Sequence, residues 1–216
     1  MSVVVAIKEK DRVVIGADSQ TTRGESKRTS RNPNNFKVWK VRGVDNCIMA
    51  HVGRKRNANI ISLMKDLVTE YDVYKGYIDF EFVVKRIVPD IKRELVEYGF
   101  MKDEDYYEDL DSRFVFAFQN QLYYINCDGS VVEIDDYVAI GSGEGEALGS
   151  LISTEGLPAE ERVIKAIKAS SSVNLYVDYP IVIADTKECD FYVIPENEEQ
   201  EFLNLINSNT DDESSK

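Results

Sequence analysis

The chain opens with two short runs of β-branched residues separated by a charged segment. Met1–Ile7 and Val13–Ser19 are rich in valine and isoleucine, and Lys8–Arg12 between them is mostly charged. Runs of this length and composition predict two antiparallel strands joined as a hairpin. Such a hairpin would bring the start of the chain beside Asp18, near the end of the second strand.

The remaining apolar segments show the periods of strands and helices in turn. Further strands are expected at Phe36–Val41, Cys47–Val52, Phe114–Phe118, Leu122–Ile125, Val131–Ile134, Tyr137–Ile140, Pro180–Ala184 and Phe191–Ile194. Helices are expected at Asn57–Tyr71, Phe80–Tyr98, Glu144–Thr154 and from Pro158 towards Ser170. Pro89 predicts a kink or a break in the second of these helices, because proline cannot donate a backbone hydrogen bond.

This order of elements predicts the fold class. Strands come in antiparallel runs and helices come in pairs, which favours packed layers over a parallel βαβ winding. We therefore expect an α+β fold of four layers, αββα, with two antiparallel sheets packed face to face and helix pairs outside. Residues 1–195 would form this single domain, and residues 196–216 an acidic, flexible tail.

Three polar segments are expected to lie outside the layers. Gln20–Arg31 is predicted to be a loop with one short exposed strand, and the acidic, tyrosine-rich segment Met101–Ser112 a surface excursion. In the tail, Phe202–Ile206 could form one helical patch, and Asn207–Lys216 is expected to be disordered.

Composition excludes several classes of function. The chain of 216 residues carries a net charge of −13, which would repel nucleic acid and anionic membranes. No segment is long and apolar enough to span a bilayer, and the N-terminus lacks the pattern of a signal peptide. Three scattered cysteines favour neither a disulfide framework nor a zinc site, so we expect a cytoplasmic protein.

Ser2, Asp18 and Lys37 are the residues that could carry chemistry. If Met1 is removed, Ser2 offers a hydroxyl nucleophile and a free α-amine whose pKa near neutrality suits a general base. A nearby lysine would lower the amine pKa by charge repulsion, and a buried aspartate would orient that lysine. Lys40 is the competing lysine on the same segment. If Met1 stays on the chain, Ser2 has no free amine.

The first 18 residues resemble the opening of proteasome β-subunits and of the bacterial two-component proteasome-like peptidase. Those chains begin with a nucleophilic threonine and reach a Gly-x-Asp motif at the distance that separates Ser2 from Gly16-Ala17-Asp18. The Gly141-Ser142-Gly143 segment is similar to the second signature of that family. The resemblance extends over most of residues 2–194.

The resemblance implies a role for each matching residue. Ser2 matches the nucleophile, Asp18 the structural aspartate, and Lys37 the catalytic lysine if the Arg23–Asn35 loop holds a few extra residues. Gly53 matches the glycine whose backbone N–H forms the oxyanion hole, and Ser142 matches the serine that bonds near the N-terminal amine. One departure is that Ser172 stands where proteasome β-subunits place an aspartate beside that serine. The family's bacterial members also bind a monovalent cation through backbone carbonyls, and the matching positions here are Ser171, Asn174 and Val177.

By this resemblance the protein is expected to be a threonine-type endopeptidase with serine as its nucleophile. Its substrate would be a peptide or unfolded protein, cleaved inside a homo-oligomeric ring that an ATPase unfoldase feeds. It would need no cofactor beyond the cation. Two alternatives remain open: a catalytically inactive scaffold of the same fold, and an amidase that acts on small amides.

Simpler interpretations compete at single positions. His51 is the only histidine, so a Ser-His-Asp triad would have to use it, but its apolar strand favours a core residue. Cys47 and Cys127 are likewise expected in the core rather than as nucleophiles. The acidic cluster from Asp103 to Asp111 lacks the spacing of a calcium loop.

Overall fold

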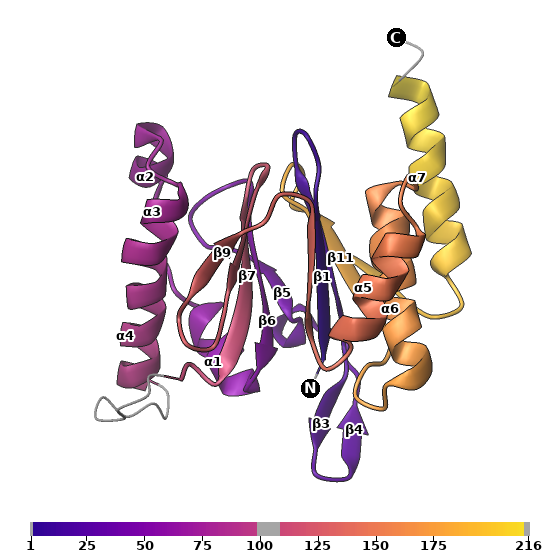
Figure 1. Cartoon of the computed structure of the whole chain (residues 1–216), viewed down its shortest axis with the longest axis horizontal. Coiled ribbons are helices and arrows are strands. Elements are labelled where there is room, and N and C mark those ends of the chain that lie inside the picture. The colour runs from indigo at the N-terminus through magenta and orange to yellow at the C-terminus, as the bar shows by residue number, and fades with distance from the viewer. Residues whose placement is uncertain (1, 99–108, 214–216) are drawn as a thin grey trace.

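The computed structural model describes residues 2–98 and 109–213, with side chains as far as Ile206. Figure 1 shows a helix layer, two sheets and a second helix layer following one another across the molecule. The predicted αββα arrangement is confirmed. Most of the predicted acidic excursion, residues 101–108, lies outside the described residues.

The first sheet holds the N-terminal strand between two neighbours, β10 and β2. Its strand order is β10-β1-β2-β11-β12, and all neighbours are antiparallel. On one side of β1, Val3 pairs with Gly141, and on the other Val4 pairs with Ala17. The end of β2 and the end of the distant strand β10 therefore both lie beside the start of β1. The strands are β10 (Tyr137–Gly141), β1 (Val3–Lys8), β2 (Val13–Asp18), β11 (Ile181–Asp185) and β12 (Tyr192–Ile194).

The second sheet is also antiparallel, in the order β5-β6-β7-β8-β9. Between the two sheets lies an apolar cluster that includes Val4, Ile15, Ile48 and Val115, all fully buried. The central strands are covered on both faces, by the other sheet and by helices, and this explains why they are apolar almost without interruption. The strands are β5 (Val38–Lys40), β6 (Cys47–Gly53), β7 (Ser112–Phe118), β8 (Gln121–Ile125) and β9 (Val131–Glu133).

Helices cover the outer face of each sheet (Figure 1). Over the second sheet lie α1 (Lys55–Ile61), α2 (Glu70–Lys75), α3 (Phe80–Phe82), the π-helical turn η2 (Val83–Ile87) and α4 (Val88–Tyr98). Over the first sheet lie α5 (Glu144–Ser153) and α6 (Ala159–Val173), with α7 (Glu199–Glu213) beyond them.

The prediction of one continuous helix over Asn57–Tyr71 was wrong. The chain leaves α1 after Ile61 and starts α2 at Glu70, where Thr69 and Asp72 form a reciprocal capping box. The connection between them buries Leu67. The break arises because a strong local N-cap starts a new helix where the apolar period alone suggested continuity.

The predicted interruption near Pro89 takes the form of a π-helical turn. Val88 N–H donates to Val83 O, five residues earlier, and Pro89 then stands in the first turn of α4. The helical backbone continues through this turn, since Val83 and Val88 both have αR dihedrals, and the wider π turn accommodates the missing N–H of Pro89.

Two polar segments are more regular than expected. The loop after β2 folds into the projecting hairpin of β3 (Thr21–Arg23) and β4 (Ser26–Arg28), followed by a short 3₁₀ helix, η1 (Pro33–Asn35). The tail, expected to be disordered from residue 207, is helical as far as Glu213. None of the helices in the described ranges is both long and apolar enough to cross a membrane.

Candidate active site

Asp18 lies at the end of β2 with its side chain buried. Its Oδ1 accepts the backbone N–H of Val3 at 2.9 Å, and its Oδ2 accepts that of Gln20 at 3.0 Å. Lys37 Nζ lies 2.7 Å from the same Oδ1. Because one carboxylate oxygen receives both groups, the lysine stands beside the residue that follows Ser2.

The backbone after the basic hairpin brings Lys37 to this position. Pro33 opens η1, which Asn32 caps, and the chain then enters β5 directly after Lys37. Burial lowers the pKa of Lys37, and the carboxylate of Asp18 opposes part of that shift. Lys40, the competing lysine, is exposed and pairs with Asp45 instead.

Ser2 is buried at the start of β1 and held by its backbone. Its N–H donates to Ser142 Oγ at 3.1 Å, and its carbonyl accepts Ser142 N–H at 2.8 Å. Gly141 has a φ of 119°, and a Cβ there would lie 2.1 Å from Ser2 O. The glycine of this motif is therefore required by the close approach of Ser2.

Ser172 does not take part in these contacts. Its hydroxyl donates to Lys168 O, and the residue is exposed. The residues that do reach the Ser142–Gly143 loop are Ser170 in the last turn of α6, which donates to Gly143 O, and Asn174, the C-cap of that helix, which donates to Ser142 O. Neither was singled out for its side chain from the sequence.

Gly53 is the last residue of β6 and lines the same pocket as Ser2. Its φ is 129°, and a Cβ would lie 2.6 Å from Asp111 O, so only glycine fits this backbone. A pocket of about 390 Å³ opens here, and its wall includes Ser2, Gly53, Gly141, Ser142 and Cys127. The pocket brings together three of the five predicted catalytic positions, and Asp18 and Lys37 are not part of its wall. Cys127, expected in the core, is half-buried at this wall, whereas Cys47 is fully buried.

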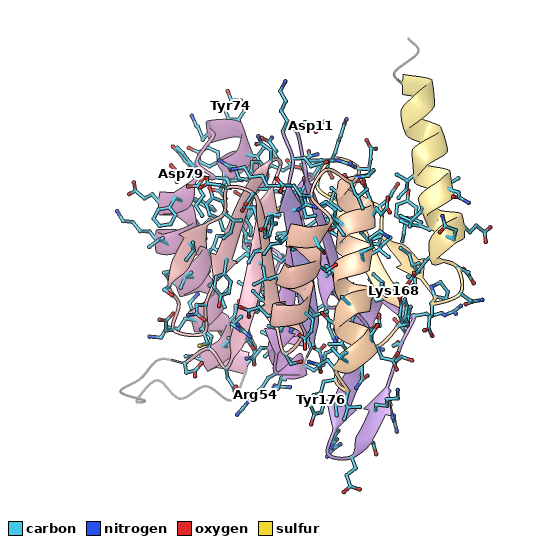
Figure 2. All side chains as sticks on the ribbon, turned by 45° about the vertical axis from the view of Figure 1, so that its right-hand side comes forward. Asp11, Arg54, Tyr74, Asp79, Lys168 and Tyr176 are labelled. Atoms are coloured by element: carbon cyan, nitrogen blue, oxygen red, sulfur yellow. The ribbon has the colours of Figure 1, made fainter. Side chains whose placement is uncertain are left out.

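The site lies at the end of the molecule that carries the β3–β4 hairpin. Arg54 follows Gly53, and Tyr176 closely follows Asn174 in the chain. Figure 2 shows both labelled residues at this end, near the projecting hairpin. Arg54 also forms an ion pair with Asp111, which lines the same pocket.

His51 is a buried structural residue here and not a partner of Ser2. Its Nε2 lies 3.2 Å from Ser112 Oγ, which also accepts the side-chain amide of Asn57 at 2.9 Å. Burial, together with the charges of Lys55 and Lys37, lowers the pKa of His51 to about 3. This network lies directly behind Gly53, because Ser112 pairs with Gly53 across β6 and β7.

Lys55 is a second lysine of the site that the sequence did not indicate. Its Nζ donates to Asn35 O at 2.8 Å, and its pKa is lowered to about 8 by burial and by the charge of Lys37. The position follows Gly53 by two residues, but only the fold brings it next to the chain before Lys37.

The residues expected to hold a monovalent cation lie around the end of α6: Ser171 is in its last turn, and Asn174 and Val177 follow it. The carbonyl of Asn174 accepts Val177 N–H at 3.2 Å and keeps a second lone pair, so the turn is compatible with a carbonyl-bound cation at Ser171, Asn174 and Val177. Among the residues that the structure describes, no group of three or more His, Cys, Asp or Glu could hold a metal ion.

Solved structures with the same fold include three bacterial or eukaryotic proteins. BPH from Thiobacillus denitrificans in complex with epoxomicin has a TM-score of 0.65 at 19% identity and covers 85% of this chain and 97% of its own. Eukaryotic HslV from Trypanosoma brucei has a TM-score of 0.61 at 19% identity, over 85% of this chain and 98% of its own. The Gly-1 mutant of Anbu from Hyphomicrobium sp. strain MC1 has a TM-score of 0.67 at 16% identity, over 100% of this chain and 96% of its own.

Sequence comparison gives the family directly. The sequence model of the proteasome subunit matches residues 2–172, which contain Ser2, Asp18, Lys37, Gly53 and Ser142. The matched range is more than half of the 216 residues. The chain therefore belongs to the proteasome subunit family.

Proposed function

We propose that this protein is a proteasome-like peptidase whose nucleophile is Ser2, exposed as the N-terminal residue by removal of Met1. The observation that carries the proposal is the shared carboxylate oxygen of Asp18, which receives both Lys37 Nζ and Val3 N–H. In this proposal, the ammonium group that shares Asp18 Oδ1 with Val3 N–H would act on the neighbouring Ser2, as an N-terminal nucleophile requires.

In this mechanism the α-amine of Ser2 is the base. It takes the proton of Ser2 Oγ, directly or through a water, while Oγ forms a bond to the carbonyl carbon of the substrate peptide. The charge of Lys37 favours the neutral form of that amine by repulsion, and Asp18 offsets part of the lysine charge. Ser142 Oγ, which lies 3.1 Å from Ser2 N, orients the amine.

The second half of the cycle returns the enzyme to its starting state. The N–H of Gly53 would donate to the oxyanion, and the C–N bond breaks as the ammonium of Ser2 gives its proton to the leaving amine. Water then attacks the ester on Ser2 Oγ with the amine again as base, which releases the acid product. A cation on the carbonyls of Ser171, Asn174 and Val177 would hold the turn after α6 in place.

The proposal includes a homo-oligomeric ring with the sites inside and an ATPase unfoldase as partner. Family membership supports the ring. Native mass spectrometry of the purified protein would give the number of subunits, and a species of one subunit only at micromolar concentration would contradict the ring.

Intact mass and turnover test the proposal together. We expect the purified protein to lack the mass of Met1 and to hydrolyse fluorogenic peptides. Ser2→Ala and Lys37→Ala should remove activity, while Ser2→Thr should keep it and Lys40→Ala should match the wild type. Epoxomicin, with which the Thiobacillus protein was solved, should add its mass to the wild type and not to Ser2→Ala.

Four outcomes would overturn the proposal in different ways. Retained Met1 would leave no catalytic amine, and equal turnover in wild type and Ser2→Ala would exclude Ser2 as the nucleophile. Turnover of small amides without cleavage of peptides would identify an amidase. An assembled, processed protein without turnover or adduct would identify a scaffold.

A further inference from the structure

Two side chains at the end of α6 hold both carbonyls of the Ser142–Gly143 loop. Ser170 Oγ donates to Gly143 O at 2.7 Å, and Asn174 Nδ2 donates to Ser142 O at 2.7 Å. Ser170 is fully buried. Consecutive carbonyls of one loop are thus tied to the last turn of α6 and to the C-cap residue of that helix.

The same loop holds the backbone of Ser2 from its other side. The N–H groups of Ser142 and Gly143 point at Ser2 O, at 2.8 Å and 3.4 Å, and Ser142 Oγ meets Ser2 N. The loop therefore lies between α6 and the N-terminal residue. A displacement of the loop would change the position of Ser2 relative to Lys37.

The backbone of this loop needs such support. Ser142 is flanked by glycines, which restrict the chain less than any other residue. Gly143 also approaches α6 so closely that a Cβ would lie 2.7 Å from Ser170 Cβ. The Ser170 hydroxyl lies 2.7 Å from Gly143 O in the loop and 3.1 Å from Ala166 O in its own helix. The hydrogen bond to the loop is therefore the shorter of the two.

We propose that Ser170 and Asn174 are positioning residues that fix Ser142 against the N-terminal amine of Ser2. This inference rests on the proposed function. The aspartate of other family members was expected to be replaced by Ser172, but Ser172 points away from the site. Here the loop is held through its carbonyls and not through a carboxylate beside the Ser142 hydroxyl.

Asn174 allows a test without loss of the fold, because it lies near the surface. Its Oδ1 accepts Tyr176 N–H at 3.0 Å while its Nδ2 holds Ser142. Asn174→Ala removes both bonds, whereas Asn174→Asp keeps the acceptor for Tyr176 and removes only the donor. Ser172→Ala, on the exposed side of the same helix end, is the matched control.

Hydrogen exchange of the full-length protein measures the loop independently of activity. Asn174→Ala and Asn174→Asp should each speed exchange at the Ser142 and Gly143 amides by about five- to tenfold, the effect of one lost hydrogen bond. Ser170→Ala should do the same, and Ser172→Ala should leave the rate unchanged. Faster exchange in Asn174→Ala alone would assign the effect to the Tyr176 turn and overturn the proposal.

Kinetics then separate positioning from simple stability. Asn174→Ala and Ser170→Ala should lower kcat about five- to tenfold with KM within twofold, and should shift the acidic limb of the pH profile that reports the Ser2 amine. Changed exchange with unchanged kcat and pH profile would overturn the positioning role. If the wild type shows no turnover, the proposed function fails, and the exchange data alone decide whether these residues hold the loop.

Discussion

Lys37 Nζ lies 2.7 Å from Asp18 Oδ1, and the two side chains are 7% and 0% exposed. A charge pair so deeply buried gives up its hydration, so its net contribution to stability is small compared with the cost of breaking it. Such a pair is expected where position matters more than stability. In this fold it links β2 to the segment that precedes β5.

Replacing Lys37 by methionine should abolish activity and destabilise the protein. Removal of the ammonium leaves the Asp18 carboxylate buried with only its two N–H donors, which should lower the free energy of unfolding by about 3–5 kcal/mol. Urea denaturation measures this change. The exposed substitution Lys40→Met is the control and should cost less than about 0.5 kcal/mol.

The double variant Lys37→Met, Asp18→Asn distinguishes charge from packing. With both charges removed, much of the lost stability should return while activity stays absent. A single variant Lys37→Met that loses less than about 1 kcal/mol would contradict the burial of an unpaired carboxylate.

Gly141→Ala should misplace Ser2. The added Cβ would lie 2.1 Å from Ser2 O at a φ of 119°, so we expect a loss of more than about 2 kcal/mol in the free energy of unfolding and loss of activity. Gly145→Ala is the matched control in α5, where a Cβ meets no atom within 4 Å. It should stabilise the protein by about 0.5–1 kcal/mol, through higher helix propensity. Equal thermal shifts in the two variants would contradict the close approach at Gly141.

Much of the fold could be predicted because local and global signals agree. The β1–β2 hairpin and the strands β7 to β9 follow from β-branched and aromatic runs with short turns between them. The helix over 57–71 failed because its apolar period continues through a break that the Thr69 cap creates. Periodicity records which residues face a core, and it does not record where a helix stops.

The site was predictable only as far as single residues carry a signature. Asp18 and Gly141-Ser142-Gly143 could be placed from the sequence, since their distances from Ser2 are those of a known motif. Asn174 and Lys55 act through side-chain contacts with the backbone of other segments, and these contacts depend on how α6 and α1 pack. No local pattern encodes such packing.

Phe202→Ala should test whether α7 is part of the domain. The Phe202 ring lies 5.3 Å from that of Tyr192 and packs against the core between the first sheet and its helices. Loss of this partly buried ring should cost about 1–3 kcal/mol, less than a fully buried phenylalanine. Calorimetry should show a lower Tm than for Asn204→Ala, an exposed control in the same helix. An unchanged Tm would show that the tail adds no stability to the domain.

His51 should make the protein sensitive to acid. In the unfolded chain the histidine binds a proton below about pH 6.5, whereas in the folded protein its pKa is about 3. Between these values the unfolded state holds more protons, so stability falls as the pH decreases from 6.5 towards 3. The loss from this group alone should reach about 1.4 kcal/mol per pH unit, and none is expected above pH 7.

His51→Gln keeps a donor for Ser112 and removes the titration. Denaturation of both proteins at pH 7.0, 5.5 and 4.5 should therefore give a difference in unfolding free energy that changes with pH, and parallel profiles would show that His51 is protonated in the folded state.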